Sequence, residues 1–190
     1  MGSEEPYYIF KICLLGPGAV GKTCIVRRYC LDTFDMNTKL TIGIDFYSSS
    51  LPVIIDGKEE TIRLSIWDFG GQEQFKKMFP YYIGGANGIF TVFSLVDLQT
   101  IRELDWWYEK LIKLGYKTTP RILVGTKNDL VKTNDKSAVN ELVIKRFMKR
   151  HKDTTFIKTS SKINYNIKPI FKEMTKLILE KNNFNYDEFL

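Results

Sequence analysis

The stretch GPGAVGKT at residues 16–23 fits the pattern G-x-x-x-x-G-K-T, and it stands between a run that predicts a strand and a run that predicts a helix. Its glycines allow backbone amides to turn inward around phosphate oxygens, and the positive end of the following helix favours the same anion. Lys22 is then predicted to reach the β- and γ-phosphates of a nucleotide, and the Thr23 hydroxyl to bind magnesium. The nucleotide-binding residues predicted here are Gly16, Gly18, Ala19, Val20, Gly21, Lys22, Thr23 and Cys24.

The segments around this loop alternate between strand-like and helix-like patterns. We predict strands over residues 8–15, 44–55, 59–68, 88–93, 121–125 and 155–159, and helices over residues 21–31, 98–114, 137–151 and 167–182. Asp56-Gly57 marks a hairpin turn between the second and third strands. Strands separated by helices require crossover connections, so we expect a three-layer α/β fold: a mostly parallel six-stranded sheet with one antiparallel edge strand and about five helices.

A second motif indicates which base the nucleotide carries. In sheets of this kind ligands bind at the carboxyl ends of the strands, so the loops after the first, third, fifth and sixth strands should converge on one site. The loop after the fifth strand reads TKND at residues 126–129. An ionised Asp129 can accept hydrogen bonds from N1 and the 2-amino group of guanine, whereas adenine offers no matching donors. We therefore predict a guanine site that contains Thr126, Lys127 and Asp129.

The order and spacing of these motifs resemble the Ras superfamily of small GTPases, over most of the chain from about Tyr8 to Asn182. The family's guanine-reading segment is usually N-K-x-D, and Thr126 is similar to the T-K-x-D variant of Rho-type members. The stretch TSSK at residues 159–162 resembles the family's T-S-A-K, whose third residue contacts the guanine oxygen through its backbone amide. The resemblance also implies that Phe34 packs edge-on against the base, with core packing as the alternative. It adds Phe34, Ser160, Ser161 and Lys162 to the predicted site.

Two further stretches resemble the switch segments of this family. LTIGIDF at residues 40–46 is similar to the first switch of Rab-type members, and WDFGGQE at residues 67–73 is similar to the second switch, with a double glycine more like that of Arf and Roco GTPases. The resemblance implies that Thr41 and Asp68 hold magnesium, that the Gly71 amide binds the γ-phosphate, and that Gln72 orients the attacking water. The predicted catalytic residues are Gln72, Lys22, Thr41 and Gly71, and the predicted magnesium ligands are Thr23, Thr41 and Asp68.

The composition sets the size and the surface of the protein. A chain of 190 residues that is 44% hydrophobic can bury one core, so we expect a single GTP-binding domain over residues 1–190, with its core at about 8–182. The formal charge of +6 is scattered, which favours a solvated surface over nucleic-acid binding. The densest basic cluster falls on the predicted helix 137–151, whose opposite, apolar stripe is expected to be Val139, Leu142, Val143 and Phe147.

The cysteines, the histidine and the chain ends exclude other classes of function. Three cysteines and the lone His151 are too few for a nitrogen and sulfur metal centre or a histidine-based triad, and free thiols suit a reducing compartment. The last residues contain no cysteine for prenylation, and Pro6 stands where a myristoylation signal requires Ser or Thr. We therefore expect no lipid anchor in this chain. Without a signal peptide, we expect a cytoplasmic protein.

Together these features predict a GTP/GDP-dependent switch that binds magnesium and hydrolyses GTP slowly. Effectors, exchange factors and activating proteins are expected to bind through residues 38–46 and 69–82. The stripe of Phe75, Met78, Phe79 and Tyr82 suits either core packing or partner binding. A nucleotide-binding interaction module without hydrolysis is the alternative, while Asp129 disfavours an ATP-using P-loop kinase. Lys39 stands two residues before Thr41, so no internal arginine finger is named.

Overall fold

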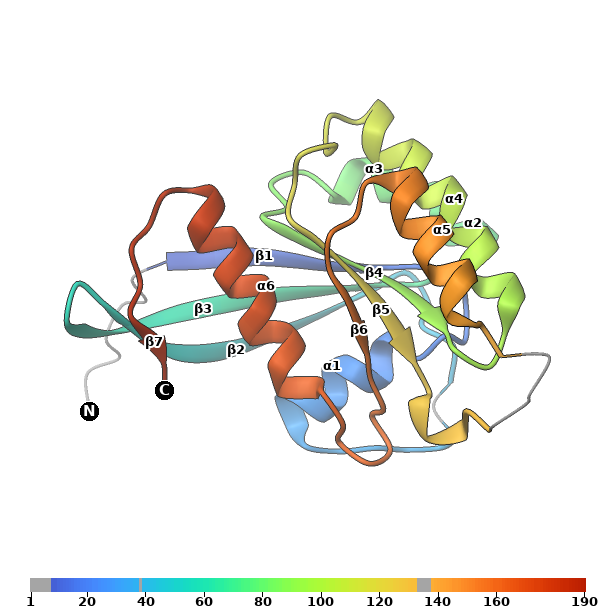
Figure 1. Cartoon of the computed structure of the whole chain (residues 1–190), viewed down its shortest axis with the longest axis horizontal. Helices are drawn as coiled ribbons and strands as arrows, with labels where there is room; N and C mark the ends of the chain where they lie inside the picture. Colours follow the sequence, from blue (N-terminus) through green and yellow to red (C-terminus); the bar gives the residue numbers. More distant parts are fainter. Residues whose placement is uncertain (1–7, 38, 133–137) are drawn as a thin grey trace.

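The computed structural model describes residues 8–37, 39–132 and 138–190. At its centre lies a seven-stranded sheet with the strand order β6-β5-β4-β1-β3-β2-β7 (Figure 1). The strands β1, β3, β4, β5 and β6 pair in parallel, and β2 pairs antiparallel with both β3 and β7. Their bounds are β1 (Tyr8–Leu15), β2 (Ile44–Ile55), β3 (Lys58–Phe69), β4 (Gly88–Ser94), β5 (Arg121–Thr126), β6 (Phe156–Lys158) and β7 (Glu188–Phe189).

Helices cover both faces of the sheet. They are α1 (Lys22–Leu31), α2 (Glu73–Lys76), α3 (Phe79–Tyr82), α4 (Leu98–Lys113), α5 (Glu141–His151) and α6 (Ile167–Lys181), and a 3-10 helix spans Asn128–Leu130. The residues of α1 and α6 pack into one hydrophobic core, and those of α3, α4 and α5 pack into the other. The structure is therefore the predicted three-layer α/β fold.

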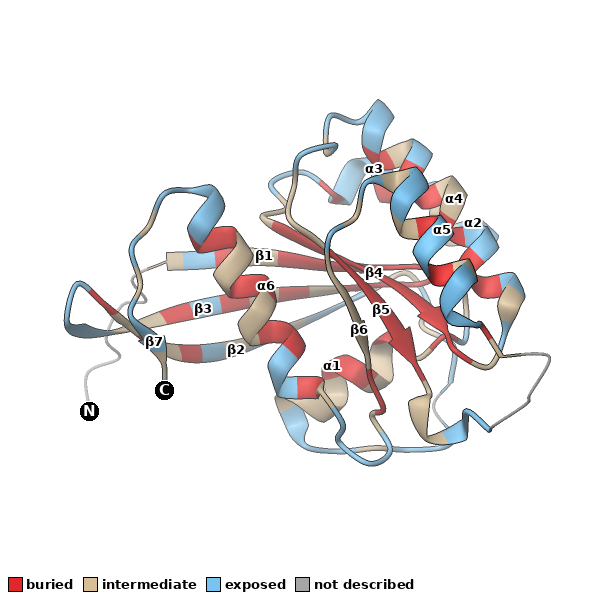
Figure 2. Ribbon diagram, in the orientation of Figure 1, coloured by how far each residue is buried: buried red, intermediate tan, exposed pale blue. Residues whose placement is uncertain are grey.

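Alternation along β1 explains why two cores form. Ile12 and Leu14 point into the core beneath α1 and α6, whereas Cys13 and Leu15 point into the core beneath α4 and α5. Figure 2 shows the same pattern as buried residues along the middle of the sheet. Because β1 is buried on both faces, the loop that follows Leu15 starts from an immobile base.

The hairpin of β2 and β3 is long and continuously paired. The register runs from Ile55 opposite Lys58 to Ile44 opposite Phe69. Asp56 and Gly57 both have positive φ, at 50° and 73°, as a two-residue turn that matches the strand twist requires. The predicted Asp56-Gly57 turn is confirmed, and the hairpin joins this tip to the segment that carries Thr41.

The C-terminal tail adds a seventh strand that the sequence patterns do not predict. In β7, Phe189 lies opposite Val53, and Glu188 lies opposite Ile54. The Asp187 amide donates to the Ile54 carbonyl at 2.8 Å, and the Asp187 carboxylate accepts from the Gly57 amide at 3.0 Å. The antiparallel edge of the sheet is therefore β7, and the predicted edge strand β2 lies one position further in.

Most predicted elements agree with the structure to within one residue, but α5 differs. It begins at Glu141, after the Asn140 side chain accepts from the Val143 amide, and the predicted start at residue 137 lies outside the described residues. The predicted apolar stripe is wrong at Leu142, which is 64% exposed, because Ile144 faces the core together with the predicted Phe147.

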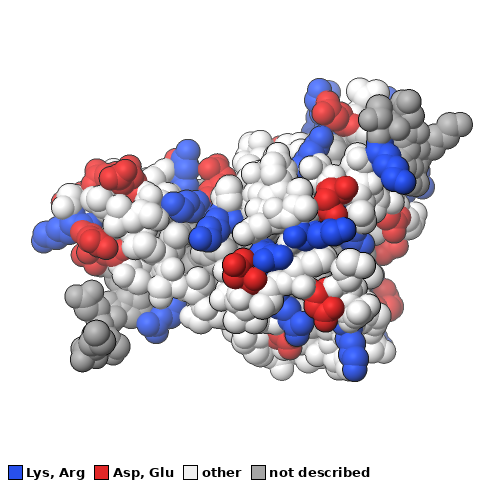
Figure 3. Space-filling view, turned by 90° about the horizontal axis from the view of Figure 1, so that it is seen from below, with Lys and Arg blue, Asp and Glu red and all other residues white. Residues whose placement is uncertain are grey.

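Charge is dispersed over the surface. On the face seen in Figure 3, Lys and Arg side chains alternate with Asp and Glu side chains between large uncharged areas. The basic side chains of α5 are exposed, as predicted for a solvated helix face, and Arg150 pairs with Asp105 at 3.2 Å. In the described part of the chain, no helix combines the length and the hydropathy that crossing a bilayer requires.

Candidate functional site

The glycine-rich loop between β1 and α1 is shaped by close backbone packing. A side chain at Gly16 would lie 2.1 Å from the Val92 carbonyl oxygen, so only glycine fits there. Gly21 and Ala19 have positive φ, which turns the loop back toward α1. The Lys22 ammonium donates to the carbonyls of Gly16 at 2.9 Å and Pro17 at 2.7 Å, so the loop folds around this cation.

Lys22 and Asp68 form a buried pair of opposite charges beside the loop. Lys22 is 5% exposed and Asp68 is fully buried. Burial lowers the pKa of Lys22 to about 8 against the attraction of Asp68, and burial raises the pKa of Asp68 to about 6 against the attraction of Lys22. Desolvation thus drives both groups toward their neutral forms. A bound polyanion at Lys22 and a cation at Asp68 would favour the charged form of each group.

Three side-chain oxygens meet next to this pair. The hydroxyls of Thr23 and Thr41 lie 2.6 Å apart, and the Asp68 carboxylate oxygen Oδ2 lies 2.5 Å from the first and 3.4 Å from the second. The other carboxylate oxygen, Oδ1, is buried without a hydrogen-bond partner in the described chain. Hydroxyl and carboxylate oxygens are ligands that Mg²⁺ accepts, and its bound waters could satisfy the orphaned oxygen. The donor set therefore fits magnesium.

The double glycine of the second switch is required by close packing. At Gly70 a side chain would lie 2.7 Å from the Thr41 carbonyl oxygen and 3.0 Å from the Gly43 carbonyl oxygen. The backbone amide of Gly70 donates to the Gly43 carbonyl at 2.8 Å. At Gly71 a side chain would lie 2.4 Å from the Gly18 nitrogen. Gly70 thus contacts the first switch, and Gly71 contacts the phosphate loop.

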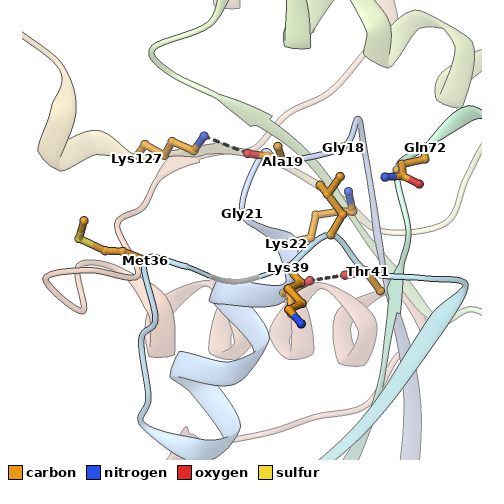
Figure 4. A pocket seen from close by; sticks show the side chains of 12 residues that line it. Gly18, Ala19, Gly21, Lys22, Met36, Lys39, Thr41, Gln72 and Lys127 are labelled. Carbon is orange, nitrogen blue, oxygen red and sulfur yellow. Dashed lines mark hydrogen bonds between the residues drawn. The ribbon is translucent and has the colours of Figure 1, made fainter.

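Figure 4 shows the cavity that these segments enclose, with Gln72 and Thr41 at one end and Lys127 and Met36 at the other. The cavity has a volume of about 260 Å³. Gln72 precedes α2, and its side-chain oxygen accepts from the side-chain amide of Gln74 at 3.2 Å. A side chain at Gly18 would lie 3.8 Å from the Gln72 side chain, so the two positions face each other.

An adjoining cavity of about 290 Å³ is lined by six of the residues predicted for the base site, Phe34, Thr126, Lys127, Asp129, Ser161 and Lys162, together with Gly21 and Cys24 of the predicted phosphate loop. Lys127 links the two cavities, because its ammonium donates to the Ala19 carbonyl at 2.9 Å (Figure 4). The Thr126 hydroxyl donates to the Val20 carbonyl at 2.5 Å, so it ties the two loops together. Asp129 accepts from the Ser160 hydroxyl at 2.5 Å, which fixes the carboxylate.

Arg28 of α1 braces this second cavity, and no sequence pattern singles it out. Its Nε donates to the Ser161 carbonyl at 2.8 Å, and its Nη1 donates to the Asp32 carbonyl at 2.9 Å. Asp32 ends α1 just before Phe34, so one guanidinium holds both the loop at Ser161 and the segment that carries the aromatic ring.

The structure brings the predicted site residues into one region, with four of them behind the cavity walls: Gly16, Val20, Asp68 and Ser160. Gly16 and Val20 shape the loop from behind, and Ser160 positions Asp129. The cavities are also lined by residues that were not predicted as site residues, and these are Asp35, Met36, Lys39, Leu40 and Leu130. Lys39 and Leu40 belong to the predicted first switch, whereas Asp35, Met36 and Leu130 lie outside every quoted motif, so only the fold places these three at the site.

The aromatic stripe after the second switch divides between core and surface. Phe79 is fully buried, Phe75 and Met78 are half-buried, and Tyr82 is exposed. Trp67 contacts the exposed Phe46 edge-on, with 4.5 Å between ring centroids, and lies 6.3 Å from the Tyr82 ring. Core packing therefore holds for Phe79, and the exposed Tyr82 is available for the predicted partner binding.

Comparison with known sequences places this geometry in a family. Residues 11–180 match the Ras family. Among similar proteins, the GTP-binding protein ypt1 of Schizosaccharomyces pombe is 33% identical over 183 residues, which is 96% of this chain and 86% of the relative. GTP-binding protein YPT1 of Saccharomyces cerevisiae is 34% identical over 94% of this chain and 82% of its own length. Ras-related protein Rab-1A of Dictyostelium discoideum is 33% identical over 90% of this chain and 81% of its own length.

Proposed function

The chain belongs to the Ras family and is a small GTP-binding protein and GTPase that uses Mg²⁺, and from that premise we propose how its residues divide the work. Lys22 and the loop amides bind the phosphates, and Asp129 with the Ser161 amide reads the guanine. Thr23, Thr41 and Asp68 hold the metal, and residues 8–190 act as one GTP-binding domain. The observation that carries this assignment is the meeting of the three oxygens beside the buried Lys22.

In the proposed hydrolysis a water attacks the γ-phosphorus in line, and the bond to the β–γ bridging oxygen breaks, so that GDP and inorganic phosphate leave. The Gln72 side chain orients the water, and the Gly71 amide donates to a γ-phosphate oxygen. Magnesium, when bound, neutralises charge on the β- and γ-phosphates. No arginine lines the phosphate cavity among the described residues, which supports slow intrinsic turnover.

We propose that partners recognise the two switch segments, at residues 39–46 and 69–82, and residue 38 of the predicted first segment lies outside the described chain. Phe46 is 59% exposed, and Ile42 and Tyr82 are also exposed in these two segments. Thr41 and Gly70 lie at the inner side of the same segments, so loss of the γ-phosphate would alter this apolar surface. Effectors, exchange factors and activating proteins are the expected partners. The cysteines, none of which forms a disulfide within the described chain, support the proposed cytoplasmic location.

Single-turnover hydrolysis of preloaded GTP tests the role of Gln72. Gln72→Leu keeps the size but removes both hydrogen-bonding groups, so hydrolysis should slow at least about tenfold, or about 1.4 kcal/mol. GTP affinity should remain close to that of the unaltered protein. The exposed Gln99 offers a matched control, and Gln99→Leu should leave the rate unchanged.

If the unaltered protein shows no turnover above the solution rate, with magnesium and with candidate activating proteins, a nucleotide-binding module without hydrolysis would replace the proposal. If both variants hydrolyse at the same rate, Gln72 has no part in catalysis. Purified protein should retain guanine nucleotide, and Asp129→Asn should weaken GTP while favouring xanthine nucleotides, because an amide places donors against guanine donors.

A further inference from the structure

A second polar cavity opens at the opposite end of the sheet from the nucleotide loops. It has a volume of about 250 Å³ and lies among the loop after α4, the loop after α5 and the last turns of α6. These loops lead into β5 and β6, whereas the nucleotide loops leave β1, β3 and β5. In Figure 1 the C-terminal ends of α4, α5 and α6 point toward the upper side of the molecule, where these loops lie.

Arg121 lies in the wall of this cavity and is rigidly held. Its side chain is 10% exposed, and its Nε donates to Asp153 at 3.2 Å. Asp153 is 1% exposed and also accepts from the Tyr108 hydroxyl, which lies 2.8 Å from the Thr91 hydroxyl. The guanidinium sits 5.1 Å from the centre of the Tyr108 ring. Buried groups on two sides thus fix this cation in place.

The outer part of the guanidinium has few partners. Its Nη1 lies 3.4 Å from the Tyr116 carbonyl and 3.5 Å from the Lys117 carbonyl, both at the long limit of a hydrogen bond. Within the described chain, Nη2 makes no hydrogen bond. The Nε edge of the Arg121 guanidinium is held by Asp153, and its Nη2 remains available as a donor. An arginine held in this way is suited to bind an oxyanion such as phosphate.

Three lysines surround this arginine. Lys117, Lys152 and Lys181 line the cavity and are exposed, and none of them forms an ion pair with another described residue. The single lining carboxylate, Asp153, is already engaged by Arg121, so four cations face one anion. Hydroxyl donors are also present, from Thr118, Thr119 and Thr154.

These lysines are not explained by the helix ends nearby. Carbonyls at the end of α4 already accept from the Leu114 and Tyr116 amides. In α5 the Met148 carbonyl accepts from the Lys152 amide, and in α6 the Ile178 carbonyl accepts from Asn182. The three helix termini together contribute about −1.5 elementary charges at most. The lining side chains carry three net positive charges, so the cavity stays electropositive.

We propose that this cavity binds a compact ligand with two or more phosphate groups, in which Arg121 donates to one phosphate and Lys117, Lys152 and Lys181 neutralise the rest. The site is independent of GTP, because its walls come from the other end of the strands. Such phosphates occur on soluble inositol phosphates and on the headgroups of phosphorylated lipids, and both sources share the chemistry recognised here.

The test uses the full chain loaded with GDP and magnesium, so that the nucleotide site is occupied. Inositol 1,4,5-trisphosphate is titrated by calorimetry, and the Arg121 Nε–H resonance is followed by NMR, since general attraction to lysines would not move it. The variant Lys117→Gln/Lys181→Gln removes two rim cations without exposing Asp153. Lys58→Gln/Lys168→Gln removes the same charge from exposed lysines at the hairpin and at the first turn of α6.

The unaltered protein and the control should bind equally, the rim variant should bind at least about tenfold more weakly, and the Arg121 resonance should shift. Vesicles of phosphatidylcholine with phosphatidylinositol 4,5-bisphosphate then separate the two sources of phosphate. If the vesicles capture the protein and the soluble trisphosphate competes with this capture, the ligand is a lipid headgroup. If the vesicles do not capture the protein, the ligand is a soluble inositol phosphate. No calorimetric binding, an unmoved Arg121 resonance, or equal loss in both variants would overturn the proposal.

Discussion

At the scale of single residues, Gly70 sets how closely the two switch segments approach. The Thr41 and Gly43 carbonyls occupy the space that a side chain would need. In Gly70→Ala the new methyl group should push the first switch away and misplace the Thr41 hydroxyl, a predicted metal ligand. The magnesium concentration that half-saturates the GTP-bound protein should then rise about tenfold or more. Fluorescent-nucleotide release against magnesium concentration measures it.

Gly84 provides the matched control for this experiment. A side chain there would meet nothing within 4 Å, so Gly84→Ala should leave the magnesium dependence unchanged. Identical magnesium dependence in Gly70→Ala and the unaltered protein would show that the switches tolerate the extra methyl group.

Arg28 is expected to govern how long the nucleotide stays bound. Its guanidinium joins the Ser161 loop to the end of α1, and both flank the proposed base site. In Arg28→Gln the loss of these charged hydrogen bonds should speed GDP release about tenfold or more, since such bonds contribute about 1.5–3 kcal/mol. Stopped-flow release of a fluorescent GDP analogue measures this, and single-turnover hydrolysis of preloaded GTP should hardly change.

The neighbouring Arg27 is the control for position and charge. Its side chain interacts with Tyr47 on the hairpin, and its backbone carbonyl, which the substitution keeps, accepts from the Asp32 and Thr33 amides. Arg27→Gln should therefore release GDP at the normal rate, and equal acceleration in both variants would mean that α1 is merely destabilised.

At the scale of secondary-structure elements, the tail strand β7 protects the edge of the sheet. Tyr186 and Phe189 pack against the core and against each other, and Phe184 contacts Tyr8 with ring centroids 4.6 Å apart. Truncation after Asn182 should lower the free energy of unfolding by at least about 2 kcal/mol, because several aromatic side chains lose burial. Urea denaturation of the GDP-bound protein measures it.

The truncated chain should also associate at high concentration, since the outer edge of β2 would lose its partner. Light scattering detects this, and replacement of the exposed Asn185 by Ala should leave both properties unchanged. An unaltered urea midpoint after truncation would mean that the tail adds no stability.

The elements that the sequence predicts are those with a strong local signal. The apolar run of β1, the glycine-rich loop and the Asp56-Gly57 turn each contain their own geometric cause, and the structure agrees with all three. The strand β7 has no such signal: its stretch NNFNYDEF alternates only over residues 184–187, before the strand begins, and its pairing joins Phe189 to the distant Val53. Non-local contacts of this kind come from the assembled fold.

The same limit explains what was missed at the site. From the sequence alone, the double glycine indicates only a subfamily. The structure shows why glycine is needed there, because Thr41 and the phosphate loop, from other parts of the chain, occupy the space that a side chain would take. Arg28 sits on a helix whose charge pattern is unremarkable, and its role depends on Ser161, which is far away in sequence. Motifs thus predict which side chains gather, and the fold determines how they are held.

At the scale of the whole molecule, occupancy of the nucleotide site should set stability. Burial lowers the pKa of Lys22 and raises the pKa of Asp68, so keeping both groups charged without a ligand costs desolvation free energy. Bound phosphate and magnesium would offset this cost. Nucleotide at a thousand times its dissociation constant adds about 4 kcal/mol. Removal of GDP and magnesium should then lower Tm by about 8–16 °C for a chain of this size.

Differential scanning fluorimetry with and without EDTA and phosphatase treatment measures this shift. Adding back GDP with magnesium should restore Tm, whereas ADP with magnesium should not. A Tm that is the same with and without nucleotide would show that the buried pair is stable on its own.

The contact between Tyr8 and Phe184 brings both ends of the described chain to one side of the molecule, away from the nucleotide loops (Figure 1). This matters for how the protein can be handled on a surface. Immobilised through either end, on a sensor chip or a bead, the domain would stand with its switch segments facing the solution. A fluorescent protein fused at either end would likewise leave that face open to binding partners.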